Sequence, residues 1–150
     1  MMYVRQMTVS DIDRAFEIAC LSLEERYLKE VFHFFISGWP GGQLVAVDDV
    51  GHVIGFLSGA RLTPDKATVP LFAVDHRYRG KGIGSRLMEE FRLRASIDGK
   101  QYIQLEVKGT SAAAISFYKK AGFTPIAYLE GFYQDGTDGV RMLRSVRGDS

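Results

Sequence analysis

The chain has 150 residues, 46% of them apolar, and a formal net charge of +1 at pH 7. This length and composition fit a globular domain with a real hydrophobic core, and we expect residues 1–150 to form a single domain. The small net charge gives no field that would attract nucleic acid. No apolar run approaches the ~20 residues of a membrane span, and the first residues lack the apolar stretch of a signal peptide. The composition therefore predicts a cytoplasmic protein without nucleic-acid or membrane partners.

Residues that often form disulfides or bind metals are few and scattered. The single cysteine, Cys20, has no intramolecular partner, and its apolar helical context predicts a buried side chain. The histidines, His33, His52 and His76, do not have the spacing of metal ligands. We therefore expect no metal cofactor.

Hydrophobic periodicity predicts helices and strands in the order β-α-α-β-β-β-α-β-α-β-β. The predicted helices begin near residues 11, 28, 83 and 111, and the predicted strands cover residues 3–7, 43–48, 52–60, 68–75, 101–107, 123–129 and 139–146. Alternation of this kind favours a mixed α/β sheet with helices on its faces.

The strand predicted at residues 68–75 contains a proline, Pro70. Because proline has no N–H for the ladder, it is confined to edges and irregular parts of sheets. We therefore expect the sheet to be bulged or splayed at this strand.

A glycine-rich turn, Arg79–Gly84 (RGKGIG), lies between that strand and the next predicted helix. Such a turn aims backbone N–H groups at one point, and the helix dipole adds partial positive charge there. Arg77, Arg79 and Lys81 would add full charges. The turn does not match the Walker A pattern of nucleotide-binding loops, G-x-x-x-x-G-K-[ST]. It supplies only the first half of the dinucleotide-binding pattern, G-x-G-x-x-G. The glycine turn therefore predicts a site for a pyrophosphate. The structural alternative is a turn in which glycine serves only the backbone conformation.

Three stretches together resemble the GNAT superfamily of acyl-CoA-dependent N-acetyltransferases. They are the strand Leu71–Val74, the turn Arg79–Gly84, and the signature A-x-x-x-Y-x-x-x-G-F at Ala114–Phe123. The resemblance covers essentially the whole chain. It implies the GNAT α/β fold, in which a mixed, mostly antiparallel central sheet is splayed between strands 4 and 5 and carries helices on both faces.

Two further stretches are similar to protein N-terminal acetyltransferases of the ribosomal-protein-alanine and broad-specificity archaeal types. One is Leu23–Tyr27 with Trp39-Pro40 downstream, and the other is Phe132–Asp138. On this resemblance, Glu25, Tyr27 and Tyr133 would contact an acceptor peptide. The chain departs from these relatives at Glu24, where they have proline, and at Phe132, which replaces a tyrosine.

The resemblance also implies how acetyl-CoA, the co-substrate, would bind. The main chain of Phe72–Val74 would bond the pantetheine arm of the cofactor. A backbone N–H near Phe72 or Ala73 would stabilise the thioester oxyanion. The backbone of the glycine turn would hold the pyrophosphate. The cofactor-binding residues implied are Phe72, Ala73, Val74, Arg79, Gly80, Lys81, Gly82, Ile83, Gly84, Ser85 and Ser111.

Glu106 and Tyr118 are the candidate catalytic residues. An α-amino group has a pKa near ~8 and a lysine near ~10.4, so an N-terminus is easier to deprotonate by roughly 3 kcal/mol. Glu106 would act as the base, directly or through one water. Tyr118 would protonate the departing CoA thiolate. The structural alternatives are a solvated glutamate at a strand end and a core aromatic residue.

The sequence therefore predicts an enzyme that transfers acetyl from acetyl-CoA to the α-amino group of protein or peptide N-termini by direct attack on the thioester. Two alternatives stay open at this point. The first is a GNAT acetyltransferase that acts on a small-molecule amine, and the second is a non-catalytic module that binds acyl-CoA. Association with the ribosome or with a second copy of the chain is also left open.

Overall fold

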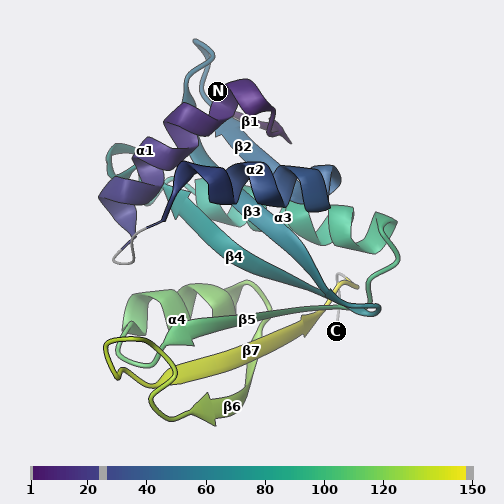
Figure 1. The fold of residues 1–150 in the computed structure, drawn as a ribbon, viewed down its shortest axis with the longest axis vertical. Coiled ribbons are helices and arrows are strands. Elements are labelled where there is room, and N and C mark those ends of the chain that lie inside the picture. The colour runs from purple at the N-terminus through teal and green to yellow at the C-terminus, as the bar shows by residue number, and fades with distance from the viewer. Residues whose placement is uncertain (1, 24–26, 148–150) are drawn as a thin grey trace.

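The structure, a computed structural model, describes residues 2–23 and 27–147 (Figure 1). Within these residues the predicted strands and helices are all present and in the predicted order. The strands are β1 (Tyr3–Gln6), β2 (Gln43–Val47), β3 (Val53–Thr63), β4 (Lys66–Val74), β5 (Tyr102–Lys108), β6 (Thr124–Leu129) and β7 (Gly139–Ser145). The helices are α1 (Ile12–Ser22), α2 (Lys29–Gly38), α3 (Ile83–Ile97) and α4 (Ala112–Lys120), with 3-10 turns η1 (Val9–Asp11), η2 (Pro40–Gly42) and η3 (His76–Tyr78).

The described strands form one seven-stranded sheet in the order β1-β2-β3-β4-β5-β7-β6. Every neighbouring pair in this sheet is antiparallel except β4 and β5, which are parallel. The expected mixed, mostly antiparallel sheet is therefore confirmed.

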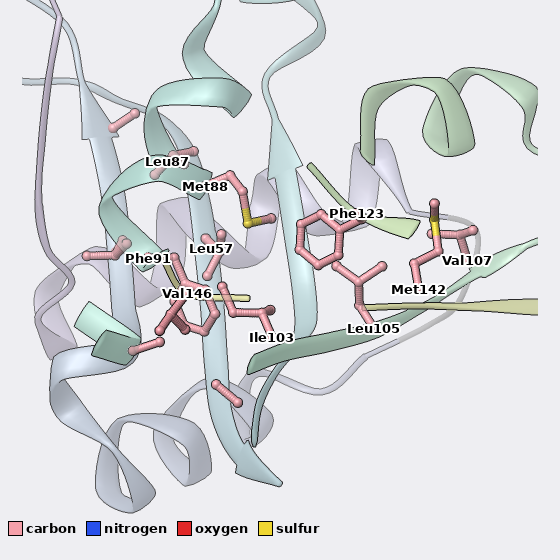
Figure 2. Close-up of a cluster of buried hydrophobic side chains, with 14 of the residues drawn as sticks. Leu57, Leu87, Met88, Phe91, Ile103, Leu105, Val107, Phe123, Met142 and Val146 are labelled. Carbon is pink, nitrogen blue, oxygen red and sulfur yellow. The ribbon is translucent and has the colours of Figure 1, made fainter. Parts of the chain in front are cut away.

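Helices cover both faces of the sheet. On one face, α1 and α2 pack on a core that includes Phe32 and Phe56, whose rings meet edge to face. On the other face, α3 contributes a buried stripe at three- and four-residue spacing, which is the period of a helix. Figure 2 shows three members of this stripe, Leu87, Met88 and Phe91, with Leu105 and other side chains from β5, β7 and their neighbours.

Cys20 is exposed, and the prediction of a buried side chain was wrong. The buried stripe of α1 consists of Ile12, Ala15, Ile18 and Ala19. Successive helical residues are rotated by about 100°, so the residue after Ala19 points away from the sheet.

The sheet is both bulged and splayed where Pro70 predicts it. Val69 and Pro70 together lie opposite the single residue Gly59 of β3, which is the geometry of a β-bulge. Parallel pairing joins Lys66–Thr68 to Tyr102–Gln104 and covers only the start of the two strands. Beyond this point β4 and β5 diverge toward different parts of the molecule (Figure 1). This divergence opens the space in which the candidate site lies.

Candidate active site

A cleft of about 500 Å³ lies between the diverged end of β4 and helix α4. Four parts of the chain form its walls: the end of β4, the glycine turn with the start of α3, the first turns of α4, and the C-terminal end of α1. The lining residues are Ser22, Leu23, Phe72, Ala73, Val74, Tyr78, Arg79, Gly80, Ile83, Gly84, Ser111, Ala113, Ala114, Phe117 and Tyr118. Segments that are far apart in the sequence thus meet at one site.

The glycine turn has a backbone conformation that requires glycine at two positions. Gly80 and Gly82 have φ angles of 78° and 80°, in the left-handed region. A side chain at either position would have nothing within 4 Å, so the dihedral angle and not space explains the glycine. Gly82 is also the N-cap of the 15-residue helix α3. The N–H groups of the first turn of α3, which have no partner within the helix, therefore lie at the cleft wall.

The three cations beside the turn differ in their surroundings. Arg79 lines the cleft, and its Nε donates to the carbonyl of Val74 at 3.3 Å. Lys81 is exposed, with its Nζ 5.7 Å from the centre of the Tyr78 ring. Arg77 differs, because its Nε and Nη2 donate to the carboxylate of Asp75 at 3.2 and 2.8 Å. Its guanidinium is thus held by a carboxylate that it shares with Arg14, while 66% of the Arg77 side chain stays exposed.

Most of the predicted cofactor-binding residues line this one cleft. Phe72, Ala73, Val74, Arg79, Gly80, Ile83, Gly84 and Ser111 are among its wall residues. Lys81, Gly82 and Ser85 belong to the same turn and the first turn of α3, but lie just outside the wall. Ser111 is the N-cap of α4, and its Oγ accepts from the N–H of Ala114 at 3.4 Å.

Tyr118 faces the cleft from α4 and is held by aromatic neighbours. Its ring centre lies 5.2 Å from that of Phe117, 5.5 Å from that of Phe123 and 6.4 Å from that of Phe72. Burial, with a smaller contribution from the nearby Tyr133, raises the pKa of Tyr118 above its usual value of 10. The phenol therefore stays protonated at neutral pH and is a hydrogen-bond donor.

Glu106 lies on the diverged half of β5 and outside the residues that line the cleft. Its neighbours Leu105 and Val107 enter the core, so Glu106 points to the opposite face, where it is partly buried. Arg141 stands directly opposite on β7, and its Nε donates to Oε2 of Glu106 at 2.8 Å. Gln104 donates weakly to the same oxygen at 3.4 Å.

Sequence reasoning missed Arg141. The signal that was available is a charged residue between the apolar Val140 and Met142, both of which are buried in the structure, on the strand predicted at residues 139–146. Its partner depends on the register of β5 and β7, which one sequence does not reveal.

The loop between β6 and β7 brings a second group of polar side chains to this region. Tyr133 is partly buried, and Nζ of Lys108 lies 5.4 Å from its ring centre. Lys108 also pairs with Asp135 at 3.1 Å. Hydrogen bonds from Thr137, with the Lys108 charge as a lesser cause, lower the pKa of Asp135 to about 2. This loop is therefore held by hydrogen bonds within itself and by Lys108 at the end of β5.

The other predicted acceptor residues lie after α1. Tyr27 is partly buried against the core formed with α1 and α2. Glu25 lies outside the described residues. The described residues contain no group of three or more histidine, cysteine, aspartate or glutamate side chains placed to hold a metal ion. None of the described helices is both long and apolar enough to span a membrane.

Comparison with known proteins places this geometry in a family. The model of the GNAT acetyltransferase domain matches residues 39–125. N-alpha-acetyltransferase 30 of Schizosaccharomyces pombe is 34% identical over 81% of this chain and 83% of its own length. An N-alpha-acetyltransferase of Sulfurisphaera tokodaii is 28% identical over 93% of this chain and 90% of its own length. The crystal structure of Ard1 from Thermoplasma volcanium superposes with a TM-score of 0.92, at 34% identity over 97% of this chain and 98% of that one.

These matches agree with the splayed sheet, the glycine turn at the helix N-terminus and the signature in α4. They confirm the resemblance on which the sequence interpretation rests. The chain belongs to the GNAT family of acetyltransferases.

Proposed function

We propose that this protein transfers an acetyl group from acetyl-CoA to the α-amino group of protein N-termini. The observation that carries the proposal is the cleft where β4 leaves β5, with the glycine turn and the N-terminus of α3 in its wall. Relatives named N-alpha-acetyltransferases, similar over most of the chain, support this acceptor. We also propose that residues 1–150 act as a single domain, because one sheet runs through all the described strands.

The cofactor would lie along main-chain groups. From Leu71 to Val74 β4 pairs with β3 on one side, and Phe72–Val74 line the cleft. An extended pantetheine arm would add to the Phe72–Val74 segment much as a further strand would. The N–H groups of Arg79–Ser85 and the dipole of α3 would hold the pyrophosphate. Ser111 would be a further contact from α4.

Glu106 would act as the base for the acceptor. The α-amino group reaches the site as an ammonium, and it must lose a proton before its nitrogen attacks the thioester carbonyl. Because Glu106 is not among the residues that line the cleft, it would remove this proton through a water molecule. Arg141 would hold the carboxylate in place by its hydrogen bond to Oε2.

Tyr118 would act on the leaving group. Attack forms the C–N bond, a main-chain N–H of Phe72 or Ala73 would stabilise the oxyanion, and collapse then breaks the C–S bond. A phenol with a raised pKa is a weaker acid than a thiol of pKa ~8.5, so complete proton transfer from Tyr118 to the thiolate is unfavourable. Tyr118 would instead stabilise the thiolate by a hydrogen bond, and the second proton of the attacking nitrogen would neutralise it.

Two segments border the acceptor side and support a peptide over a small amine. Ser22 and Leu23, at the end of α1, line the cleft and lead to Tyr27. The β6–β7 loop brings Tyr133 close enough to Tyr118 to influence its titration. Glu25, Tyr27 and Tyr133 would then contact the first residues of an extended peptide.

A direct assay tests the proposal. The protein is incubated with acetyl-CoA and peptides that differ only in their first residue, and release of the CoA thiol and the mass of each peptide are measured. We expect acetylation at the α-amine and none on peptides whose α-amine is already blocked but which contain lysine. Acetylation of polyamines alone would show a small-molecule enzyme, and CoA binding without product would show a binding module.

A protein partner beyond the substrate is a separate proposal. Three large apolar side chains near the α1–α2 connection, Leu21, Leu28 and Phe34, are exposed by 70% or more. Where exposed apolar side chains form one contiguous patch, another protein often covers them. Association with the ribosome is tested by co-sedimentation with purified ribosomes, and a homodimer is tested by light scattering.

A further inference from the structure

Asp75, the first residue after β4, is a buried carboxylate that joins two walls of the cleft. It is 6% exposed and accepts hydrogen bonds from both sides. From the 3-10 turn η3, the backbone N–H of Arg77 donates to Asp75 at 3.0 Å, and its guanidinium donates at 3.2 and 2.8 Å. From α1, Nη2 of Arg14 donates at 2.6 Å.

The same cluster is anchored to the sheet. The backbone N–H of Asp75 donates to the carbonyl of Ile54, and its carbonyl accepts from the N–H of Tyr78, each at 2.8 Å. Nε of Arg14 donates to the carbonyl of Val53 at 3.1 Å. Helix α1, strand β3, the end of β4 and the turn η3 therefore meet at one carboxylate.

This connection matters because both connected segments reach the cleft. The chain that leaves Asp75 forms the cleft wall from Tyr78 to Gly84, and α1 ends at Ser22 in the opposite part of the wall. Replacing the Asp75 carboxylate removes the acceptor that the half-buried Arg14 and the exposed Arg77 share, and these two cations are then no longer held together. A shift at Asp75 would move the turn relative to α1 and misplace the N–H groups of the turn.

We infer that Asp75 is a positioning residue that sets the place of the glycine turn relative to α1, and thereby the affinity for the diphosphate of CoA. The inference rests on the proposed function, because it takes the turn to be the diphosphate site. Asp75 does not line the cleft, and it would act through its hydrogen bonds with Arg14 and Arg77.

The test compares Asp75→Asn with a matched control, Asp11→Asn. Asp11 is equally buried, pairs with Arg5 at 2.8 and 2.9 Å, and accepts the N–H of Thr8, but it braces the start of α1 against β1. Calorimetry with CoA should show about tenfold weaker binding for Asp75→Asn. At saturating acetyl-CoA its kcat should stay within about twofold, because the reacting groups are untouched. Asp11→Asn should lose comparable thermal stability and keep its affinity for CoA.

A second pair of variants separates positioning from direct contact. If Arg77 acts only through Asp75, then Arg77→Gln as a single substitution weakens CoA binding. The same substitution adds little further loss of affinity in the Asp75→Asn background. If Arg77 itself binds the diphosphate, the two effects add, and the inference is overturned. Arg14→Lys keeps a cation opposite Asp75 and should retain more CoA affinity than Arg14→Gln.

Two further results would overturn the inference. One is a folded Asp75→Asn protein that binds CoA as tightly as the unaltered protein, and the other is an equal loss of affinity in Asp11→Asn. The outcome is separable from that of the proposed function, since calorimetry with CoA needs no acceptor. Failure of peptide acetylation with intact CoA binding would remove the acceptor assignment alone, whereas no CoA binding by the unaltered protein would remove both.

Discussion

The proposed cofactor side and the proposed acceptor side of this site are built from different parts of the chain. On the cofactor side the groups that face the cleft are mainly backbone: the free side of β4, the glycine turn and the N-terminus of α3. On the proposed acceptor side the candidate groups are side chains from β5, β7 and the β6–β7 loop. They lie outside the cleft lining and are joined as the pairs Glu106–Arg141 and Lys108–Asp135. Backbone groups tolerate many side chains but demand particular dihedral angles. Side-chain pairs tolerate many dihedral angles but demand particular residues.

The two sides should therefore respond to different substitutions. Changes of backbone conformation in the turn should act on CoA affinity, and changes of functional groups on β5 should act on turnover. The predictions below test this separation.

The largest effect is expected for Glu106→Gln. Loss of the base should lower kcat by about 100-fold or more, while calorimetry should show unchanged binding of CoA. Glu90→Gln is the matched control, because Glu90 is also partly exposed and paired with an arginine, Arg94, at 2.9 Å. Full turnover in Glu106→Gln would remove Glu106 from the mechanism.

Tyr118→Phe should have the next largest effect. The ring contacts with Phe117 and Phe123 are kept, and only the hydroxyl is lost. Loss of a hydrogen bond to a charged leaving group should lower kcat by about 10- to 100-fold. Tyr128→Phe removes a hydroxyl from an exposed ring and should leave the kinetics unchanged. Equal kcat values for Tyr118→Phe and the unaltered protein would reduce Tyr118 to a packing role.

Gly82→Ala should affect CoA binding and not turnover, in contrast to the two substitutions above. We expect weaker CoA binding and little change in kcat at saturating acetyl-CoA. An alanine held at a φ of 80° costs about 1–2 kcal/mol. Relaxation of that strain would turn the N–H groups of the turn, and we expect about tenfold weaker binding of CoA. Gly99→Ala is the matched control, because Gly99 follows the other end of α3 with a φ of 83° and equally open surroundings. Similar losses of CoA affinity in both variants would show that general destabilisation is the cause.

The smallest effect concerns Asp135 and the pH dependence of stability. Its folded pKa of about 2 lies below the ordinary value of 3.8, so its contribution is present above about pH 4 and is lost as the pH falls toward 2. The side chain is exposed, and the contribution is small. Between pH 4 and 2, thermal unfolding of Asp135→Asn should therefore depend slightly less on pH than that of the unaltered protein. An identical slope would show that Asp135 is not coupled to folding.

The cofactor side was largely predictable because its constraints are local. Gly80, Gly82 and Pro70 are residues whose backbone restrictions can be recognised in a single sequence, and each lies where its restriction requires. The acceptor side was predictable only in part. Glu106 was proposed from its place in the strand predicted at residues 101–107 and from the family resemblance. Its partner Arg141 was not predicted, because cross-strand partners are set by a register between segments 35 residues apart.

What the sequence determined by itself is the order of helices and strands, the irregularity at Pro70 and the glycine turn, because periodicity and backbone restrictions act over a few residues. Only the tertiary structure decided that Lys66–Thr68 form the parallel pairing between β4 and β5, beyond which the two strands separate. Most of this segment lies before the predicted start of the strand, at residue 68. The tertiary structure also decided that Asp75 accepts hydrogen bonds from both Arg77 and Arg14, and that Cys20 is exposed. These outcomes depend on which distant segments pack together, and packing of that kind leaves no local pattern in the chain.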